Sequence, residues 1–401
     1  MRAGTKILTG ILITALILSL SPNNAPAETE KGGCAVTVYF PNWSVYSDSR
    51  CRVENLPWDR IDCVNHAFWK VAPRDSGYAL VSTDPGADAD HFAQYAECLK
   101  KYPGKKVLLS VGGWTACGYF SEMALTGESR SSFIESCLDT FEKYPFLSGI
   151  DIDWEYPGVP RSGGEGDEGC PVLGDDRTNY TLLLKELREA LDARFGPGEK
   201  LLTVCACAAL STLKMQDYAA LHLYVDRVNL MTYDLAGPWD TVTGHQSALY
   251  GSNSADAAVG YLRGLGVPAE KIAVGSPLYS HGWKLTAPAA DPVGAAAAGL
   301  GSGDLTRKKL LPLERSAVPE DTPGWHTGYD EKRGAAWLFN DDPSSPNYLT
   351  FYTYESVSSL DAKLEYIREN GLGGLIVWQV HGDAAEEDWP MITRMYRGLH
   401  Q

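Results

Sequence analysis

The sequence predicts an α/β protein with the (β/α)8 TIM barrel fold and a small α+β insertion between strands seven and eight. Short apolar runs rich in β-forming residues recur eight times along the chain, and helix-length segments separate them. Runs that are apolar nearly throughout are typical of parallel strands covered on both faces. Eight such alternations favour a closed barrel over an open doubly wound sheet, which remains the alternative.

The predicted strands alternate with the predicted helices along most of the chain. The strands span residues 35–40, 62–68, 106–111, 149–154, 201–207, 227–233, 272–279 and 374–380. Helices are expected at 90–101, 131–144, 179–194, 255–265 and 357–370. Within 181–191 the apolar residues recur at helical spacing, which gives this covering helix one buried stripe.

One interval breaks the alternation, because nearly a hundred residues separate the seventh strand from the eighth. It contains an Ala/Gly-rich loop, a basic helix candidate at 305–313 and a strand-like segment at 335–339. The aromatic residues Trp325, Tyr329 and Trp337 argue against a disordered loop. We therefore predict an α+β insertion domain at 284–350 and a barrel made of residues 28–283 and 351–401.

The N-terminus has the pattern of an export signal. Arg2 and Lys6 precede an uncharged apolar run at 7–20, and Ala25-Pro-Ala27 follows. This order is typical of a secretory signal peptide, predicted here at 1–27, so we expect a secreted, extracellular protein. A transmembrane helix is the alternative, but about 14 apolar residues are fewer than the ~20 that span a bilayer. After cleavage of the peptide, no membrane association is expected.

Charge and cysteine content limit the partners and the compartment. The chain has 51 acidic and 35 basic residues, and it has no Lys/Arg cluster that could follow a phosphate backbone. Nucleic acid is therefore not an expected partner. All nine cysteines lie in the first 207 residues, and in an oxidising compartment some of them should form disulfides. We expect the protein to be a monomer. In a monomer, an odd number of cysteines leaves at least one thiol free.

The segment most informative about chemistry is Ser148-Gly-Ile-Asp-Ile-Asp-Trp-Glu-Tyr-Pro157. Side chains alternate along a strand, so Asp151, Asp153 and Glu155 share one face, and in a barrel that face is the interior. Like charges this close cannot all ionise, so we expect at least one raised pKa. Glu155, nearest the mouth, is best placed to hold a proton for a leaving group. A Mg²⁺ or Ca²⁺ site and a solvated acidic edge are the alternatives, and burial on an apolar strand argues against the edge.

This segment resembles the Asp-x-x-Asp-x-Asp-x-Glu signature of the family 18 glycoside hydrolases, the chitinases. The resemblance covers the chain from Ala35 to the C-terminus, and the insertion resembles the chitinase insertion domain. Five further motifs are similar to those of the family: Val38-Tyr-Phe-Pro-Asn-Trp43, Asn65-His-Ala-Phe68, Leu109-Ser-Val-Gly-Gly-Trp114, Met231-Thr-Tyr-Asp234 and Gly373-Gly-Leu-Ile-Val-Trp378.

The resemblance implies substrate-assisted, retaining hydrolysis, in which the 2-acetamido oxygen of the sugar attacks its own anomeric carbon. It implies that Glu155 protonates the glycosidic oxygen and later deprotonates water. Asp153 would bind the acetamido N–H and stabilise the oxazolinium intermediate, Asp151 would share its proton, and Tyr233 would orient the acetamido oxygen. The implied substrate contacts are Tyr39, Phe68, Trp114, Met231, Asp234 and Trp378. No cofactor and no metal ion are expected.

Three positions depart from the family pattern. Ser148 stands where the first Asp of the signature is usual, which bears on the proton relay and the pH optimum. Gln379 follows the eighth-strand Trp where Glu is common. Tyr279-Ser280-His281 replaces the frequent Tyr-Gly-Arg. The last two bear on contacts along the cleft.

The function predicted from the sequence is a secreted endo-chitinase that hydrolyses β-1,4 bonds between N-acetylglucosamine units, with chitin or chitooligosaccharides as its partners. An endo-β-N-acetylglucosaminidase and a chitin-binding lectin with weak or lost catalysis are the alternatives. The insertion favours the chitinase, because a walled cleft suits a long linear polymer. Glu155 argues against the lectin, because lectins of this resemblance typically lack the acid.

Overall fold

The computed structural model describes Met1 and residues 35–47, 52–300, 303–319 and 321–400. The predicted signal peptide at 1–27 lies outside the described residues except for Met1. The described residues from 35 onward belong to one compact unit. Among the described residues, no helix combines the length and the apolar character needed to cross a membrane.

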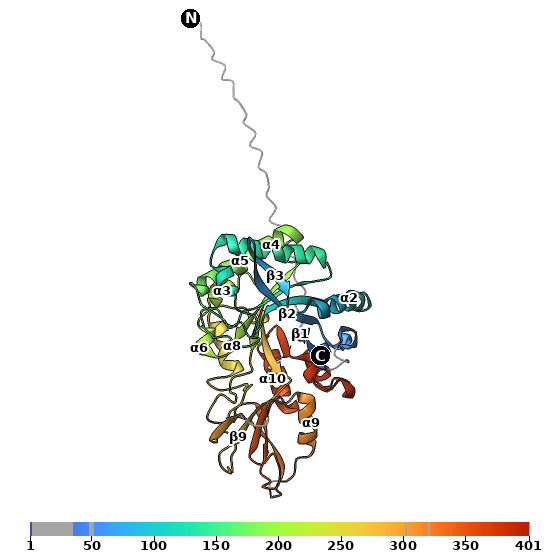
Figure 1. Ribbon diagram of the computed structural model, residues 1–401, viewed down its shortest axis with the longest axis vertical. Coiled ribbons are helices and arrows are strands. Elements are labelled where there is room, and N and C mark those ends of the chain that lie inside the picture. Colours follow the sequence, from blue (N-terminus) through green and yellow to red (C-terminus); the bar gives the residue numbers. More distant parts are fainter. Residues whose placement is uncertain (2–34, 48–51, 301–302, 320, 401) are drawn as a thin grey trace. The chain divides into compact units, whose positions relative to one another are not determined.

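Within the described chain, eight parallel strands close into the barrel that the sequence predicts. Figure 1 shows the chain coloured along the sequence, with the first strands labelled. The barrel closes because β1 pairs with both β2 and β14. β2 runs further than predicted and pairs antiparallel with β3 (Gly77–Ser82), a hairpin that we did not predict. The barrel strands are β1 (Ala35–Pro41), β2 (Cys63–Arg74), β4 (Lys106–Gly112), β5 (Gly149–Asp153), β6 (Leu201–Cys207), β7 (Arg227–Met231), β8 (Ile272–Pro277) and β14 (Gly374–Trp378).

The helices around the barrel begin up to five residues before their predicted starts. The side chains of Asp84, Thr126 and Asp175 cap α2, α4 and α5, each accepting a backbone N–H in the first turn. The described α-helices outside the second sheet defined below are α1 (Ser44–Ser47), α2 (Pro85–Lys101), α3 (Phe120–Ala124), α4 (Gly127–Lys143), α5 (Asp176–Phe195), α6 (Leu210–Leu213), α7 (Tyr218–Leu221), α8 (Ala255–Gly264), α10 (Val357–Glu369) and α11 (Pro390–Leu399). The described 3-10 turns are η1 (Val53–Asn55), η2 (Trp58–Arg60), η3 (Ala269–Lys271), η4 (Val380–Gly382) and η5 (Ala385–Glu387).

The main apolar core lies between the strands and the surrounding helices, and this fixes the orientation of β5. Ile150, Ile152 and Trp154 are buried in that core, where the ring of Trp154 stacks on Phe120 with centroids 5.2 Å apart. Because side chains alternate along a strand, the intervening acidic residues of β5 face the barrel interior. The apolar face of the strand thus holds the acidic face inside the barrel.

A second, antiparallel sheet lies between β8 and α10 in the described chain, with strand order β10-β9-β13-β12-β11. Its elements are β9 (His281–Leu285), β10 (Ala297–Leu300), α9 (Arg307–Arg315), β11 (Trp325–Asp330), β12 (Ala335–Asn340) and β13 (Thr350–Tyr354). Leu310 of α9 packs against Trp325, Leu338 and Tyr352, which gives this region an apolar cluster of its own. The sheet extends past 284–350 at both ends, and the division into two domains stays a prediction.

The expected disulfides are not found among the cysteines that the structure describes. Among the described residues, Cys63, Cys98, Cys117, Cys137, Cys170, Cys205 and Cys207 are all free. Six of them are buried, so in this structure they contribute apolar volume to the interior rather than cross-links. Cys34 and Cys51 lie outside the described residues.

Candidate active site

Asp151 lies at the centre of a buried hydrogen-bond network inside the barrel. Its carboxylate accepts hydrogen bonds from the hydroxyls of Tyr39, Ser110 and Thr203 at 2.9, 2.8 and 2.5 Å, and from the Asn229 amide at 2.9 Å. The sheet register places Ser110 and Thr203 level with Asp151 on the neighbouring strands. Donors from β1, β4, β6 and β7 therefore hold this carboxylate in one position, which compensates for its removal from water.

Asp153 and Glu155 lie further along the same chain segment, where the barrel supplies fewer donors. Among the described residues, Asp153 Oδ1 is buried without a hydrogen-bond partner. Burial raises the pKa of Asp153 well above its usual range, and the negative charges of Glu155 and Asp151 raise it further. Burial also raises the pKa of Glu155 to about 7, against the lowering effect of a hydrogen bond with Tyr156. The raised pKa that the sequence predicts is therefore found at both residues.

Tyr233 lies beside this acidic pair, and a glycine on the next strand makes room for its ring. A Cβ atom on Gly275 of β8 would come within 2.6 Å of the Tyr233 ring. Burial raises the pKa of the Tyr233 hydroxyl, and the negative charge of Asp153 adds to the rise. The hydroxyl consequently keeps its proton over the whole neutral range and can act as a hydrogen-bond donor.

Aromatic side chains line the mouth of the barrel above the carboxylates. The Trp378 ring stacks on Phe68 at 5.6 Å between centroids and meets the edge of Tyr39 at 5.8 Å. Met231 belongs to the same apolar cluster. Trp43, to which the sequence analysis assigned no role, lies 6.4 Å from Trp378 and is partly exposed. Four of the six predicted substrate contacts, Tyr39, Phe68, Met231 and Trp378, thus form one cluster.

Two glycines let β4 end close against this cluster. Gly112 and Gly113 have positive φ angles of 111° and 77°. A Cβ atom on Gly112 would lie 2.2 Å from the backbone oxygen of Asp153, and one on Gly113 would lie 2.6 Å from the Phe68 ring. The Gly-Gly pair is therefore required both for its backbone conformation and for close packing against the acidic segment.

Trp114 and Asp234, the other two predicted substrate contacts, lie outside the apolar cluster. Trp114 follows the glycine pair and is 51% exposed, with the guanidinium of Arg161 over its ring at 4.0 Å from the centroid. Asp234 follows β7 with a positive φ of 57°, and its side chain is half-exposed. Its negative charge contributes to the raised pKa of Glu155, so the two carboxyl groups are electrostatically linked.

Ser148 lies apart from the acidic site. Its hydroxyl oxygen accepts the backbone N–H of Val107 at 3.3 Å, at the start of β5. The Asp151 network is instead built by Tyr39, Ser110, Thr203 and Asn229. In the part of the chain that the structure describes, the hydrogen bonds to Asp151 therefore come from β1, β4, β6 and β7 and not from Ser148.

Several polar residues around the acidic segment were missed by the sequence analysis. Ser110, Thr203 and Asn229 occupy inward-facing positions on apolar strands, and that alternation is a signal that could have identified them. Cys117 was also missed, although its sulfur accepts the backbone N–H of Glu155 at 3.2 Å. It lies in a loop, where no periodicity indicates what it contacts.

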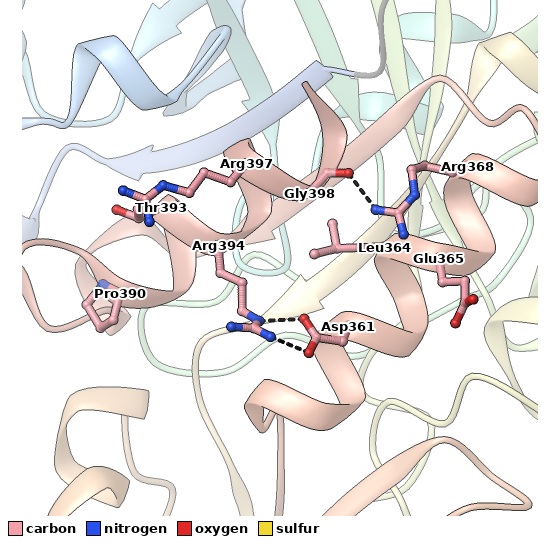
Figure 2. A pocket seen from close by; sticks show the side chains of 9 residues that line it. All are labelled: Asp361, Leu364, Glu365, Arg368, Pro390, Thr393, Arg394, Arg397 and Gly398. Carbon is pink, nitrogen blue, oxygen red and sulfur yellow. Dashed lines mark hydrogen bonds and ion pairs between the residues drawn. The ribbon is translucent and has the colours of Figure 1, made fainter. Parts of the chain in front are cut away.

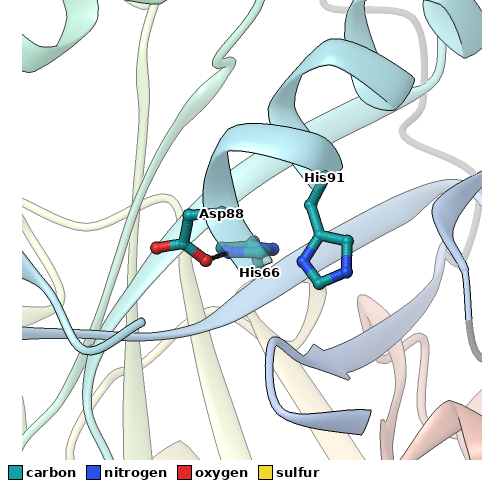
Figure 3. A group of neighbouring side chains, drawn as sticks. All are labelled: His66, Asp88 and His91. Carbon is teal, nitrogen blue, oxygen red and sulfur yellow. Dashed lines mark hydrogen bonds and ion pairs between the residues drawn. The ribbon is translucent and has the colours of Figure 1, made fainter. Parts of the chain in front are cut away.

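A different group of side chains brings possible metal ligands together. His66, Asp88 and His91 are buried between β2 and α2, and their candidate ligand atoms all lie within 4.8 Å of one another (Figure 3). Asp88 accepts hydrogen bonds from His66 at 2.7 Å, from Asn42 at 3.1 Å and from Ser82 at 2.5 Å. Burial lowers the pKa of His91 to about 4, which keeps the ring neutral. We interpret His66 and Asp88 as part of a buried hydrogen-bond network, with His91 packed against His66 at 5.7 Å between ring centroids, and assign the group no role in a reaction.

A surface cavity of about 490 Å³ lies between α10 and α11, and none of the predicted site residues lines it (Figure 2). Arg394 forms a paired contact with Asp361 across it, and Arg368 donates to the backbone oxygen of Gly398 at 2.6 Å. These contacts join the two helices. The size of the cavity is therefore no guide to the position of the acidic site.

A parallel barrel with paired carboxyl groups of raised pKa at its mouth is typical of glycoside hydrolases. The family model described as "Glycosyl hydrolases family 18" matches residues 35–383, and the chain belongs to this family. Chitinase 1 of Aphanocladium album is 29% identical over 414 residues, covering 96% of this chain and 90% of that protein. Chitinase A1 of Niallia circulans is 29% identical over 437 residues, covering 93% of this chain, which spans only 60% of that protein's length.

Solved structures of a chitinase and of another family 18 enzyme are also similar to this chain. The Group IV chitinase of Ostrinia furnacalis aligns with a TM-score of 0.78 and 26% identity, covering 92% of this chain and all of that one. A family 18 N-acetylglucosaminidase from Paenibacillus barengoltzii aligns with a TM-score of 0.74 and 29% identity, covering 91% of this chain and all of that one. The catalytic and binding roles of the individual residues stay predictions.

Proposed function

We propose that this chain is a secreted endo-chitinase that hydrolyses β-1,4 bonds between N-acetylglucosamine units by substrate-assisted, retaining catalysis. The observation that carries the proposal is the buried pair Asp153 and Glu155, whose pKa values are both raised, next to the protonated hydroxyl of Tyr233. Its substrates are chitin or chitooligosaccharides. The similarity to named chitinases supports this choice of substrate.

Glu155 is suited to act first as an acid and then as a base. With a pKa of about 7 it is still largely protonated in mildly acidic solution, and it can donate that proton to the glycosidic oxygen. The acetamido oxygen then forms a bond to the anomeric carbon as the bond to the leaving oxygen breaks, giving an oxazolinium ion. A water molecule opens this ion, and Glu155 recovers its proton from that water. Two inversions leave the β configuration unchanged.

Asp153 and Tyr233 are suited to hold the acetamido group. The unpartnered Oδ1 of Asp153 is an acceptor for the acetamido N–H and a counter-charge for the oxazolinium ion. The Tyr233 hydroxyl is a donor for the acetamido oxygen. Asp151, fixed by its own donors, supplies the nearby charge that keeps a proton shared within the acidic group.

The aromatic cluster supports a carbohydrate ligand. One face of a pyranose ring consists of C–H groups, which pack on an aromatic ring as apolar groups do. Trp378, half-buried over Tyr39 and Phe68, is suited to carry the sugar whose bond is cut. Trp114, more exposed and on a different strand end, is suited to a sugar on the leaving-group side.

The activity is tested by incubating the purified protein with chitin hexamer and, separately, with a high-mannose glycoprotein, and identifying the products by mass. The proposal expects dimers, trimers and tetramers from the hexamer and no glycan release. Release of the glycan would favour an endo-β-N-acetylglucosaminidase, and monomer as the main product would favour an exo-acting N-acetylglucosaminidase. Binding of the hexamer without cleavage would favour a lectin.

The mechanism has its own test. If the acetamido oxygen is the nucleophile, the sugar on the non-reducing side of the cut must be acetylated. In partly deacetylated chitin, the new reducing ends should then be almost exclusively N-acetylglucosamine, and the first product should be the β anomer. Frequent glucosamine at these ends, or an initial α anomer by proton NMR, would contradict substrate assistance.

Secretion rests on the N-terminal pattern alone. We propose cleavage after Ala27 and a monomeric mature protein that does not associate with membranes. N-terminal sequencing of the protein from the medium of an expressing culture should begin at Glu28. Retention in the cells with an intact Met1 would contradict export, and sedimentation at the mass of a dimer would contradict the monomer.

A further inference from the structure

His281 is a buried histidine placed between two carboxylates that belong to different parts of the chain. Its Nε2 lies 2.7 Å from Oδ1 of Asp234, which follows the barrel strand β7. Its Nδ1 lies 3.1 Å from Oδ1 of Asp304, in the segment between β10 and α9 of the second sheet. Both carboxylates are about half-exposed. The histidine therefore bridges the barrel mouth and the second sheet.

The chemistry of the ring decides its charge. A neutral imidazole has one N–H and can donate to only one of the two carboxylates, whereas an imidazolium donates to both. The other groups packed against the ring are Tyr279, at 5.4 Å between centroids, and Trp239, at 5.1 Å. Burial lowers the pKa of His281, but the two carboxylates raise it more, to about 9. Geometry and charge therefore agree on a protonated ring at neutral pH.

Asp234 connects this bridge to the acidic site. It also accepts the Tyr279 hydroxyl at 2.5 Å on the same Oδ1 that faces His281. The Oδ1 atom is therefore used inside the protein, and only Oδ2 is left for an external ligand. The negative charge of Asp234 also raises the pKa of Glu155.

The chain has His281 where the Tyr-Gly-Arg motif has an arginine, and the two side chains differ in the number of N–H donors. An arginine has five N–H donors and can hold a carboxylate while still presenting N–H groups to a ligand. A histidinium has two, and here Nε2 is hydrogen-bonded to Asp234 while Nδ1 lies in an ion pair with Asp304. At this position the chain has an internal bridge in place of a side chain with donors to spare.

We propose that His281 is a positioning residue that, as an imidazolium, ties Asp234 to Asp304 and so holds the Asp234 carboxylate in place for the substrate. The dependence of substrate affinity on this bridge rests on the proposed function, but the bridge itself does not. Asp304 would affect the substrate only through His281 and Asp234. Loss of the proton from His281 would break one of the two contacts and loosen Asp234.

The first measurement concerns the bridge alone and needs no substrate. Nitrogen NMR of the histidine rings between pH 6 and pH 10 should show that His281 titrates near pH 9. In Asp304→Asn the midpoint should fall by about 1.5 to 2 units, because one of the two stabilising charges is gone. Titration of His281 near its ordinary value of about 6.5 would overturn the proposal.

The second measurement is the KM for chitin hexamer at pH 6 and pH 8. In Asp304→Asn the KM should rise about threefold to tenfold from pH 6 to pH 8 relative to wild type, as the ring loses its proton and Asp234 is released. At each pH kcat should stay within about twofold of wild type, because the bridge joins Asp304 to His281 and Asp234 and the charge of Asp234 is unchanged. Asp304→Glu, which keeps the charge, should restore the wild-type behaviour.

Asp341→Asn is the matched control. Asp341 forms a carboxylate–histidine pair with His326 at 3.0 Å, immediately after β12 of the same sheet, and does not take part in the bridge. It should leave the pH dependence of KM unchanged. An equal KM change in both variants, or none in Asp304→Asn, would overturn the positioning role. Failure of the wild-type protein to cleave or bind the hexamer would instead contradict the proposed function, and the NMR titration would still test the bridge.

Discussion

At the depth of Asp151 the barrel interior offers a hydroxyl or amide donor from each of four strands, β1, β4, β6 and β7. Two residues nearer the mouth, Oδ1 of Asp153 is without a hydrogen-bond partner among the described residues. Both carboxyl groups are buried, so the difference lies in their donors. A buried carboxylate with all its donors is a fixed structural element. One that lacks donors has a raised pKa and remains available to a ligand.

This contrast predicts that the largest loss of activity comes from the mouth. Glu155→Gln should lower kcat on chitin hexamer by at least about 10²-fold, because the amide cannot deliver a proton, while hexamer binding persists. Single-turnover kinetics and calorimetry would measure the two effects separately. Glu189→Gln on α5, which removes an exposed charge that faces Lys185, is the matched control and should change neither. Near wild-type turnover of Glu155→Gln would remove Glu155 from the mechanism.

The two aspartates should separate activity from stability. Asp151→Asn places an amide against groups that all donate, so it should cost about 2–4 kcal/mol of unfolding free energy. Asp153→Asn should instead lower kcat about tenfold or more while leaving the fold intact. Its stability relative to wild type should improve from pH 4 to pH 8. The reason is that a carboxyl with a raised folded pKa loses its contribution as pH rises above its unfolded value.

Denaturant unfolding of both variants at pH 4 and pH 8 would check this. Equal destabilisation of Asp151→Asn and Asp153→Asn at both pH values would contradict the contrast between the two aspartates. It would mean that the hydrogen bonds to Asp151 stabilise the fold no more than the surroundings of Asp153 do. A stable Asp151→Asn with normal Tm would show that the network around Asp151 contributes little to folding.

The same contrast explains what the sequence can predict. Alternation on β5 is local information, and it places the three acidic residues on one face because Ile150, Ile152 and Trp154 occupy the other. Which side chains donate to Asp151 depends on which residues of the other strands lie at the same height in the barrel. This register follows from barrel closure, and it places Ser110 and Thr203 opposite Asp151. No spacing within the sequence encodes that alignment.

Long-range partners are missed for a similar reason. His281 was recognised only as a departure from a motif, because its second partner, Asp304, reaches it through the fold of the second sheet. The expected disulfides are not found among the described cysteines, because composition indicates the compartment but not whether two thiols lie within bonding distance. The eight barrel strands were predicted well because each depends on its own run of apolar residues.

The pH profile offers a smaller and more quantitative test of the mouth. Because Glu155 must be protonated to donate, kcat/KM should fall above about pH 7. Asp234→Asn removes a negative charge that raises the pKa of Glu155, so the alkaline limb should move to lower pH. Rate measurements from pH 4 to pH 9 would locate the alkaline limb of the wild type and that of Asp234→Asn. An upward shift in Asp234→Asn would contradict the electrostatic link between these two groups.

The smallest expected effect is that of removing divalent ions. This test separates two interpretations of the acidic segment, a carboxylate held by hydrogen bonds at Asp151 and a metal site. A Ca²⁺ or Mg²⁺ site needs carboxylate oxygens that are free to coordinate. Around Asp151 those oxygens already accept hydrogen bonds from Tyr39, Ser110, Thr203 and Asn229. An ion there would have to displace or reorient these donors, and the Asn229 amide hydrogens would face it with the wrong polarity. Activity should therefore be unchanged after incubation with EDTA and gel filtration, whereas a large loss that Ca²⁺ or Mg²⁺ restores would establish a metal-dependent hydrolase.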